Sequence, residues 1–358
     1  MAAAVQIPKS TKALVLRKST QATQPVYHNA VLEERPIPAL KPGQVLVRIY
    51  AAAFNHRDHW IRKGVVVASG DKDDSLLRRR VFLVPMRGWE RDPEAPESFF
   101  HILGGGKANP LGTFAEYVVV ERDQVIPTPD HLDDVHAAAW PIGAVTAWRA
   151  TMVNGAVKPG DNVLITGIGG GVALVALQLC VARGADVYVT SGSQEKIRKA
   201  VELGAKGGVS YKADDWPVQL GALLKKNGAS HLNVVIDAGG GDILGKTSGI
   251  LKAGGRVVVF GMQVLSVHRA HTSPKVSMTM REVLKNQKLF GSTMGSKQDL
   301  IDATQFMAQH RIVPIVSDVL DGLESAEQGF QILEHGDHFG KVVIRIVSDS
   351  PNTFHAKL

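Results

Sequence analysis

The sequence predicts an α/β fold in which a doubly wound parallel sheet is joined to a second, mostly β domain. A chain of 358 residues is long for one domain and comfortable for two. Up to residue 141, short strand-like runs are separated by Pro and Gly, and helical periodicity is scarce. Between residues 142 and 296, apolar strands alternate with helical segments, which is typical of a parallel sheet covered on both faces. Residues 297–358 are too few for a third domain, so we expect them to return and complete the first.

The individual elements follow from these patterns. The mostly β part has predicted strands at residues 13–16, 45–49, 81–84 and 117–120. The alternating part has predicted strands at residues 163–166, 187–190, 209–211, 234–237, 256–260 and 289–292. The helices predicted between them cover residues 172–183, 194–203, 216–226 and 242–251. Two further helices, at residues 298–309 and 325–335, precede a final strand at 342–346.

A glycine-rich turn is the most informative motif. The apolar strand ending at Ile165 runs into a cluster of glycines, and Val172 opens the helix that follows. Glycine lets a backbone approach a pyrophosphate closely, and a helix N-terminus offers unpaired N–H groups to it. The spacing is a loosened variant of the dinucleotide fingerprint, so the strand before it and the helix and strand after it support the assignment. We predict that this turn binds the phosphates of a dinucleotide through Gly169, Gly170, Gly171 and Val172.

The end of the next strand indicates which dinucleotide. NAD binders place an acidic residue about 20 positions after the glycine turn, but Thr190 and Ser191 stand there. Ser191 and Ser193 offer hydroxyl groups and Lys196 a positive charge, which suits a 2′-phosphate. We therefore expect NADP(H) as the cofactor, and we assign Tyr211 to the same site. The alternative is that Ser193 only caps the following helix and Lys196 is a solvated surface charge.

Charge and hydropathy exclude two classes of partner. The formal net charge is +7, but the charges are scattered, and the densest basic cluster directly follows an acidic run. No basic helix is interleaved with aromatic residues, so no nucleic acid is expected. No apolar run is long enough to span a bilayer, so no membrane is expected either.

Cysteine content and the C-terminus bear on location. The one cysteine, Cys180, has no second cysteine with which to form an intramolecular disulfide, which indicates a reducing compartment, and its apolar neighbours predict a buried thiol. We expect a cytoplasmic protein. The final residues, Ala356, Lys357 and Leu358, closely match the peroxisomal tripeptide Ser-Lys-Leu, which leaves peroxisomal import as the alternative.

Four segments, spread over nearly the whole chain, resemble the medium-chain dehydrogenase/reductase superfamily, in its zinc-free, quinone oxidoreductase-like branch. They are residues 45–58, 112–117 (GTFAEY), 138–147 and 338–341. The resemblance implies a Rossmann domain between two parts of a GroES-like substrate domain, with hydride transfer in the cleft between the domains. It places Thr146 near the nicotinamide, and Ala238, Phe260, Gly261 and Met262 along the cofactor.

The same resemblance bears on zinc. Zinc-dependent relatives have a catalytic Cys where this chain has Asn55, and no Gly-His-Glu segment supplies another ligand. A structural zinc needs four ligands that one cysteine does not provide, so we expect no metal. The resemblance then points to Asn55 as a hydrogen-bond donor, His56 as a proton donor, and Asp58 as a group that orients the loop or the substrate. The alternatives are that Asn55 only holds a turn and that Asp58 pairs with a neighbouring arginine.

The chain differs from the family after Gly64. Relatives carry a further segment there, whereas in this chain Val65 follows Gly64 directly. Either the sequence omits a segment, or the substrate cleft is open on that side. The long loop over residues 89–110 holds Phe99, Phe100 and His101, which we expect to pack onto the domain, with substrate contact as the alternative.

The sequence thus predicts an NADPH-dependent, zinc-free oxidoreductase that reduces a small activated alkene (an enone or enoyl compound) or a quinone. An NAD(P)-dependent alcohol or aldehyde dehydrogenase, and a catalytically inactive NADPH-binding scaffold, are the alternatives. A homodimer is expected, with the segment 283–292 supplying a sheet edge that a second copy would cover.

Overall fold

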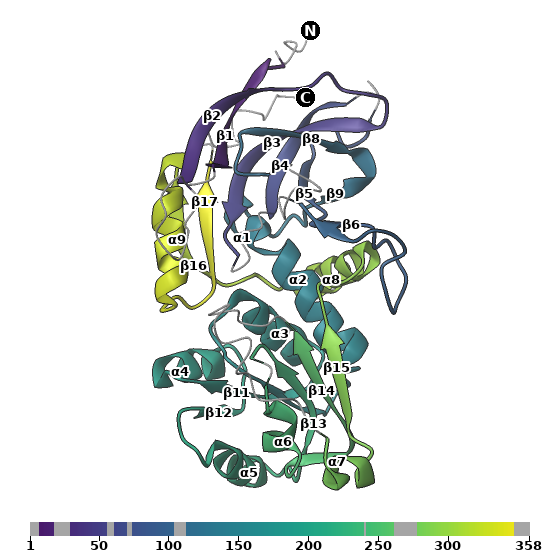
Figure 1. Ribbon diagram of the computed structural model, residues 1–358, viewed down its shortest axis with the longest axis vertical. Helices are drawn as coiled ribbons and strands as arrows, with labels where there is room; N and C mark the ends of the chain where they lie inside the picture. The colour runs from purple at the N-terminus through teal and green to yellow at the C-terminus, as the bar shows by residue number, and fades with distance from the viewer. Residues whose placement is uncertain are drawn as a thin grey trace. The chain divides into compact units, whose positions relative to one another are not determined.

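The chain folds into two compact units in the computed structural model, which describes residues 7–17, 29–55, 61–69, 74–103, 112–239, 241–260 and 278–346. Unit 1 comprises Met1–Glu90, Pro96–Pro141 and Val313–Leu358, and unit 2 comprises Arg91–Ala95 and Ile142–Ile312 (Figure 1). The predicted fold class is confirmed: one unit is built on a parallel sheet with helices, and the other is mostly β.

Every neighbouring pair of strands in the sheet of unit 2 is parallel. The spatial order is β12-β11-β10-β13-β14-β15, with strands at Gly207–Ser210, Asp186–Ser191, Asn162–Ile165, Leu232–Asp237, Leu251–Phe260 and Lys288–Ser292. In chain order this reads 3-2-1-4-5-6, the order of the doubly wound dinucleotide-binding sheet. Such sheets bind their ligands beyond the carboxyl ends of the strands, where the order reverses between β10 and β13.

Helices connect or flank these strands. They are α2 (Pro141–Trp148), the π-helical turn η2 (Arg149–Asn154), α3 (Gly171–Ala182), α4 (Gln194–Glu202), α5 (Trp216–Lys226), α6 (Ile243–Thr247), α7 (Met280–Leu284) and α8 (Lys297–His310). Of these, α3, α4, α5 and α6 bury apolar residues. The chain around Leu251 differs from the prediction, because a helix was expected to continue through residue 251. Leu251 instead pairs with Leu232 in the parallel ladder, so strand pairing overrides the helical periodicity there.

Unit 1 contains a seven-stranded sheet in the order β16-β17-β3-β4-β5-β9, with β8 also paired to β3 (Figure 1). These strands are Val316–Asp321, Lys341–Arg345, Gln44–Ala53, Ile61–Ser69, Arg80–Leu83, Val125–Pro127 and, for β8, Tyr117–Glu121. Two smaller pairs are β1 (Ser10–Arg17) with β2 (Asn29–Pro36), and β6 (Met86–Arg87) with β7 (His101–Ile102). The remaining elements are η1 (Arg122–Gln124), α1 (Asp134–Ala139), η3 (Leu323–Ser325) and α9 (Ala326–His335).

The C-terminal strand β17 lies beside β3, which is far from it in the sequence. Val343 pairs with Ala53, and Phe54 donates a backbone hydrogen bond to Val342 at 2.8 Å. Unit 1 takes up the chain again at Val313, later than the predicted return at residue 297. The reason lies in α8, whose Asp299 pairs with the buried Arg149 of unit 2 at 3.0 Å.

The junction at Gly64 lies inside a continuous strand. Gly64 pairs with Ile49 of β3 on one side and with Val81 of β5 on the other. The antiparallel sheet therefore forms across this junction without a further segment. In the loop over residues 89–110, Phe100 packs edge-on against Trp89 of the same loop at 5.9 Å between ring centroids, and Phe99 is exposed and stacks on His101.

None of the helices in the described part of the chain has the length and apolar character needed to cross a bilayer.

Candidate functional site

The glycine turn after β10 has the backbone geometry that the sequence predicted. Gly167 and Gly169 have φ angles of 63° and 138°, a region that residues with a side chain adopt only with strain. Gly170 is the N-cap of α3 and has no side chain to cap the helix. The first N–H groups of α3 are therefore left without a side-chain cap at this turn, which is the arrangement that binds phosphate at helix N-termini.

Hydrogen bonds to β11 hold this turn in place. The backbone N–H of Ile168 donates to the carbonyl oxygen of Thr190 at 2.8 Å, and that of Gly167 donates to the Thr190 hydroxyl at 3.2 Å. The turn and the end of β11 are thus fixed to each other.

Ser191, Ser193 and Lys196 lie together where β11 ends. The Ser193 hydroxyl caps α4 by accepting from the backbone N–H of Lys196 at 3.4 Å, so the capping role is present. The Ser191 hydroxyl accepts from the backbone N–H of Ser193 at 3.2 Å. The Lys196 side chain lies over the glycine turn, because a Cβ added to Gly169 would stand 2.9 Å from its Cδ and 3.4 Å from its Nζ. Lys196 is therefore directed at the predicted phosphate site.

Tyr211 and Lys212 approach the same corner from the chain beyond β12. A Cβ added to Gly192 would stand 2.7 Å from Tyr211 Oη and 2.9 Å from Lys212 Cε. Tyr211 was predicted at this site, but Lys212 was not. The position of Lys212 directly after Tyr211 is the sequence feature that could have identified it. Only the pairing of β12 with β11 brings Lys212 beside Gly192.

A buried clasp joins the ends of β10 and β13. Thr166 donates its hydroxyl hydrogen to Asp237 Oδ1 at 2.5 Å, and Asp237 is only 3% exposed. The backbone N–H of Ala238 donates to the Thr166 hydroxyl at 3.2 Å, and that of Gly239 donates to Asp237 Oδ2 at 3.1 Å. Ala238, a predicted cofactor residue, is thereby fixed at the same edge of the sheet as the glycine turn.

Two other predicted cofactor residues are also described. Phe260 is buried at the end of β14. Thr146 of α2 is buried, and its hydroxyl donates to Met294 Sδ at 3.5 Å. Met294 has a φ of 41°, an uncommon conformation for a side chain of its size. The predicted residues Gly261 and Met262 lie outside the described residues, as do His56, Asp58 and Ala356–Leu358.

Asn55 follows β3 in unit 1 and has hydrogen bonds at both ends of its amide. Its Nδ2 donates to the Ala53 carbonyl oxygen at 3.2 Å, which agrees with the turn-holding alternative. Its Oδ1 accepts from Lys341 Nζ at 2.5 Å, and the same amine donates to the Phe54 carbonyl oxygen. Lys341 is 9% exposed, and burial lowers the pKa of its amine from 10.5 to about 7. The sequence prediction missed this residue, although it lies in one of the segments that carried the family resemblance.

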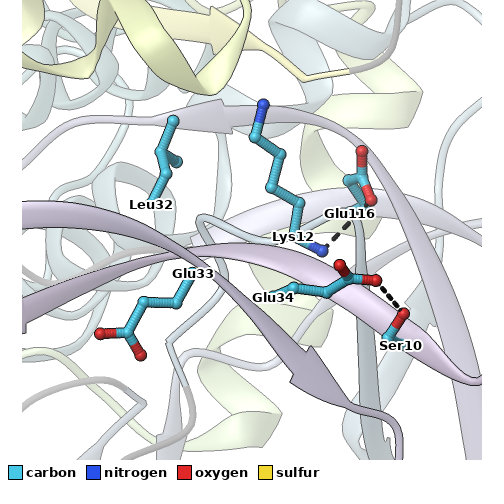
Figure 2. A pocket seen from close by; sticks show the side chains of 6 residues that line it. All are labelled: Ser10, Lys12, Leu32, Glu33, Glu34 and Glu116. Atoms are coloured by element: carbon cyan, nitrogen blue, oxygen red, sulfur yellow. Dashed lines mark hydrogen bonds between the residues drawn. The ribbon is translucent and has the colours of Figure 1, made fainter.

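A hollow in unit 1, along the β1–β2 ribbon, contains none of the predicted site residues. Its volume is about 340 Å³. Figure 2 shows the side chains that line it: Ser10, Lys12, Leu32, Glu33, Glu34 and Glu116. Polar side chains that line it have partners within unit 1: Ser10 donates a hydrogen bond to Glu34, and Lys12 forms an ion pair with Glu324. This hollow is therefore not the candidate site.

Comparison with known proteins identifies the family. The chain is 38% identical over 351 residues to the zinc-type alcohol dehydrogenase-like protein YogA of Leptosphaeria maculans (strain JN3), covering 90% of this chain and 96% of that protein. This chain is a member of the zinc-type alcohol dehydrogenase-like family. The family lies in the medium-chain dehydrogenase/reductase superfamily, as the sequence predicted, and a family model described as zinc-binding dehydrogenase matches residues 171–309.

Solved structures agree with this membership of the zinc-type alcohol dehydrogenase-like family. An NAD-dependent alcohol dehydrogenase matches with a TM-score of 0.74 and 29% identity, covering 89% of this chain and 96% of its own. Crotonyl-CoA carboxylase/reductase AntE, solved in complex with NADP, matches with a TM-score of 0.79 and 21% identity over 96% of each chain. The second likeness is one of fold alone. The protein is thus an oxidoreductase of this family with an NAD(P)-binding fold.

The name of the zinc-type alcohol dehydrogenase-like family suggests a bound zinc ion. The described residues do not supply a set of ligands that fits one. The only cysteine of the chain, Cys180, is buried in α3, and burial raises the pKa of its thiol. At Asn55, where zinc-dependent relatives place a ligand, the side-chain oxygen accepts from the Lys341 amine. That oxygen is therefore already engaged by the amine, which in its protonated form also repels a divalent cation. Within the described ranges, no three His, Cys, Asp or Glu side chains are grouped as metal ligands.

The buried amine predicts how stability depends on pH. Between its native pKa of about 7 and its ordinary value of 10.5, Lys341 is protonated in the unfolded chain and neutral in the native protein. The unfolded state then binds more protons, so raising the pH favours the native state. We expect the unfolding free energy of the wild type, relative to Lys341→Met, to rise between pH 7 and pH 10 and to be flat below pH 7. Urea unfolding at each pH measures it, and an unchanged difference over this range would show that the amine keeps its ordinary pKa.

Proposed function

We propose that this protein is an NADP(H)-dependent oxidoreductase that reduces an activated alkene or a quinone without zinc. The observation that carries the proposal is the corner at the end of β11, where two hydroxyls and a lysine directed at the glycine turn stand in place of a carboxylate.

The electrostatics of this corner favour a 2′-phosphate over a 2′-hydroxyl. Lys196 lies beside Gly169, and Tyr211 and Lys212 lie beside Gly192. The nearest carboxylate in sequence, Glu195, pairs with Lys199 at 2.8 Å, and that hydrogen bond holds the pKa of Glu195 below its ordinary value. Charge-assisted hydrogen bonds to phosphate are about twice as strong as neutral ones. The corner therefore resembles a dianion site more than a ribose site.

The rest of the proposed cofactor site follows from the same sheet edge. The backbone N–H groups at the start of α3 would bind the diphosphate, and Ala238 and Phe260 would lie along the cofactor. When bound, NADPH supplies a hydride to the β-carbon of an activated alkene or to a quinone, and negative charge develops on the substrate oxygen. In the absence of a metal, hydrogen-bond donors must stabilise that charge. We assign this task to the Asn55 amide nitrogen.

The main rival is an NAD-dependent alcohol dehydrogenase. The name of the solved structure that is 29% identical to this chain favours it. That reaction requires polarisation of an alcohol or carbonyl oxygen, which zinc supplies in zinc-type enzymes. The amine beside Asn55 argues against a metal there.

Steady-state turnover distinguishes these functions. We expect purified protein to oxidise NADPH with at least one member of a panel of enones, enoyl thioesters and quinones, and a strong zinc chelator to leave the rate unchanged. The loss of NADPH absorbance measures it, with enzyme-free reactions as the control. Chelator-sensitive oxidation of alcohols with NAD would establish the rival, and NADPH binding without turnover would indicate a catalytically inactive scaffold.

The role of Lys196 can be tested by substitution. Because it would contribute a charge-assisted hydrogen bond worth about 1.5–3 kcal/mol, Lys196→Ala should weaken NADPH binding about 10- to 100-fold and should weaken NADH binding, which shares only the diphosphate at the glycine turn, by less. Lys199→Ala is the matched control, since Lys199 lies one turn along α4 and pairs with Glu195. Calorimetric titration of both nucleotides measures the effect. Equal losses for NADPH and NADH would contradict a 2′-phosphate contact.

We further propose a homodimer formed through β15. This strand is the last in the order of its sheet, and α7, which precedes it, exposes Met280, Val283 and Leu284 by 65%, 56% and 79%. Among the described strands, β15 is paired on one side only, and such an edge beside an apolar surface suits a second copy of the same sheet.

The dimer predicts a clear result in sedimentation velocity at micromolar concentration. Wild-type protein should sediment as a dimer, and Leu284→Glu should sediment as a monomer because it places a charge in the contact. Val218→Glu, at a 71% exposed position on α5, should remain dimeric. Monomeric wild-type protein would rule the proposal out.

A further inference from the structure

Lys341 is a buried amine whose hydrogen bonds go to the chain just beyond β3. It opens β17 and donates to the Phe54 carbonyl oxygen and to Asn55 Oδ1. Pairing of β17 with β3, together with the backbone hydrogen bond from Phe54 to Val342, fixes both partners relative to the amine. The contact is therefore built into the sheet of unit 1 and does not depend on a surface loop.

The amine determines which way the Asn55 amide faces. The Lys341 amine donates to Asn55 Oδ1, and in its protonated form it has no lone pair with which to accept, so the amide atom that meets it is the oxygen. At the other end, the Ala53 carbonyl oxygen accepts from Nδ2, so that atom must be the nitrogen. The flipped amide would place N–H groups against the amine and oxygen against oxygen, which is unfavourable at both ends.

A lysine at this position carries a cost in stability. A buried amine loses hydration, and within the described residues no carboxylate forms an ion pair with Lys341. Methionine is of similar length and would fill the same volume without losing hydration, but it would leave the Phe54 carbonyl oxygen and Asn55 Oδ1 without this donor. What the amine adds, relative to an apolar side chain, is a partner for these two oxygens and, through Oδ1, the fixed orientation of Asn55.

We propose that Lys341 is a positioning residue, which holds the Asn55 amide in the one orientation that directs its nitrogen to the substrate oxygen. This inference rests on the proposed reductase function. It adds a residue from the C-terminal strand to the site, acting through Asn55 and not on the substrate itself.

The test compares Lys341→Met with wild-type protein in turnover and in the side-chain amide signal of Asn55. We expect Lys341→Met to lower kcat for enone or quinone reduction by about 10-fold or more, with KM for NADPH within about twofold. The ¹H–¹⁵N signal of the Asn55 amide, assigned by its loss in Asn55→Leu, should shift in Lys341→Met. Lys12→Met is the control, because Lys12 pairs with Glu324 in unit 1 away from Asn55.

A second variant guards against a folding defect. Lys341→Gln keeps an N–H donor in a neutral side chain that fits the lysine volume, and it should retain more kcat than Lys341→Met. Thermal unfolding of each variant shows whether it is folded.

The outcomes separate this inference from the proposed function. An unchanged Asn55 signal in folded Lys341→Met would overturn the inference, and so would a shifted signal with kcat within twofold of wild type. If wild-type protein reduces no acceptor at all, the proposed function fails first, and the positioning role fails with it.

Discussion

All six strands of the unit 2 sheet run in one direction, and the candidate cofactor site depends on that constraint. Parallel strands bring their carboxyl ends to the same edge, so the residues that follow each strand are gathered there. The glycine turn follows β10, Ser191 ends β11, and Asp237 ends β13. An antiparallel arrangement of the same strands would place half of these groups at the opposite edge. The direction of the strands thus assembles residues that lie far apart in the chain.

Buried polar contacts then fix the groups that the strands bring together. In unit 2, the Thr166–Asp237 clasp ties two strand ends and sets the backbone of Ala238. In unit 1, the Lys341 amine joins the start of β17 to the residues that follow β3. Both contacts lie at strand ends, where the ladder of backbone hydrogen bonds stops. A buried polar group requires a partner with suitable geometry, so each contact restricts the local chain to few arrangements.

Membership of a zinc-type alcohol dehydrogenase-like family does not by itself determine the chemistry of this chain. The family relates it to oxidoreductases, whereas the side chains at the site decide what it binds. At the position of a zinc ligand in metal-dependent relatives, this chain has an amide in contact with an amine. At the position of the acidic residue in NAD binders, it has a serine beside a lysine-rich corner. The first departure supports the proposed catalysis without zinc, and the second supports the proposed use of NADPH.

The sequence by itself determined the six parallel strands of unit 2, the helices α3, α4, α5 and α8, the glycine turn, and the hydroxyl and lysine residues after β11, because each depends on local patterns of hydrophobicity and on glycine. The tertiary structure alone decided where Lys212, Lys341 and Leu251 belong. Lys212 reaches the cofactor corner only because β12 pairs with β11, and Lys341 meets Asn55 only because β17 pairs with β3. Leu251 lies in a strand because its pairing with Leu232 in the parallel ladder outweighs the helical periodicity of the residues before it. Periodicity specifies which face of an element is apolar, but the partner across a sheet is a long-range choice that a local pattern does not encode.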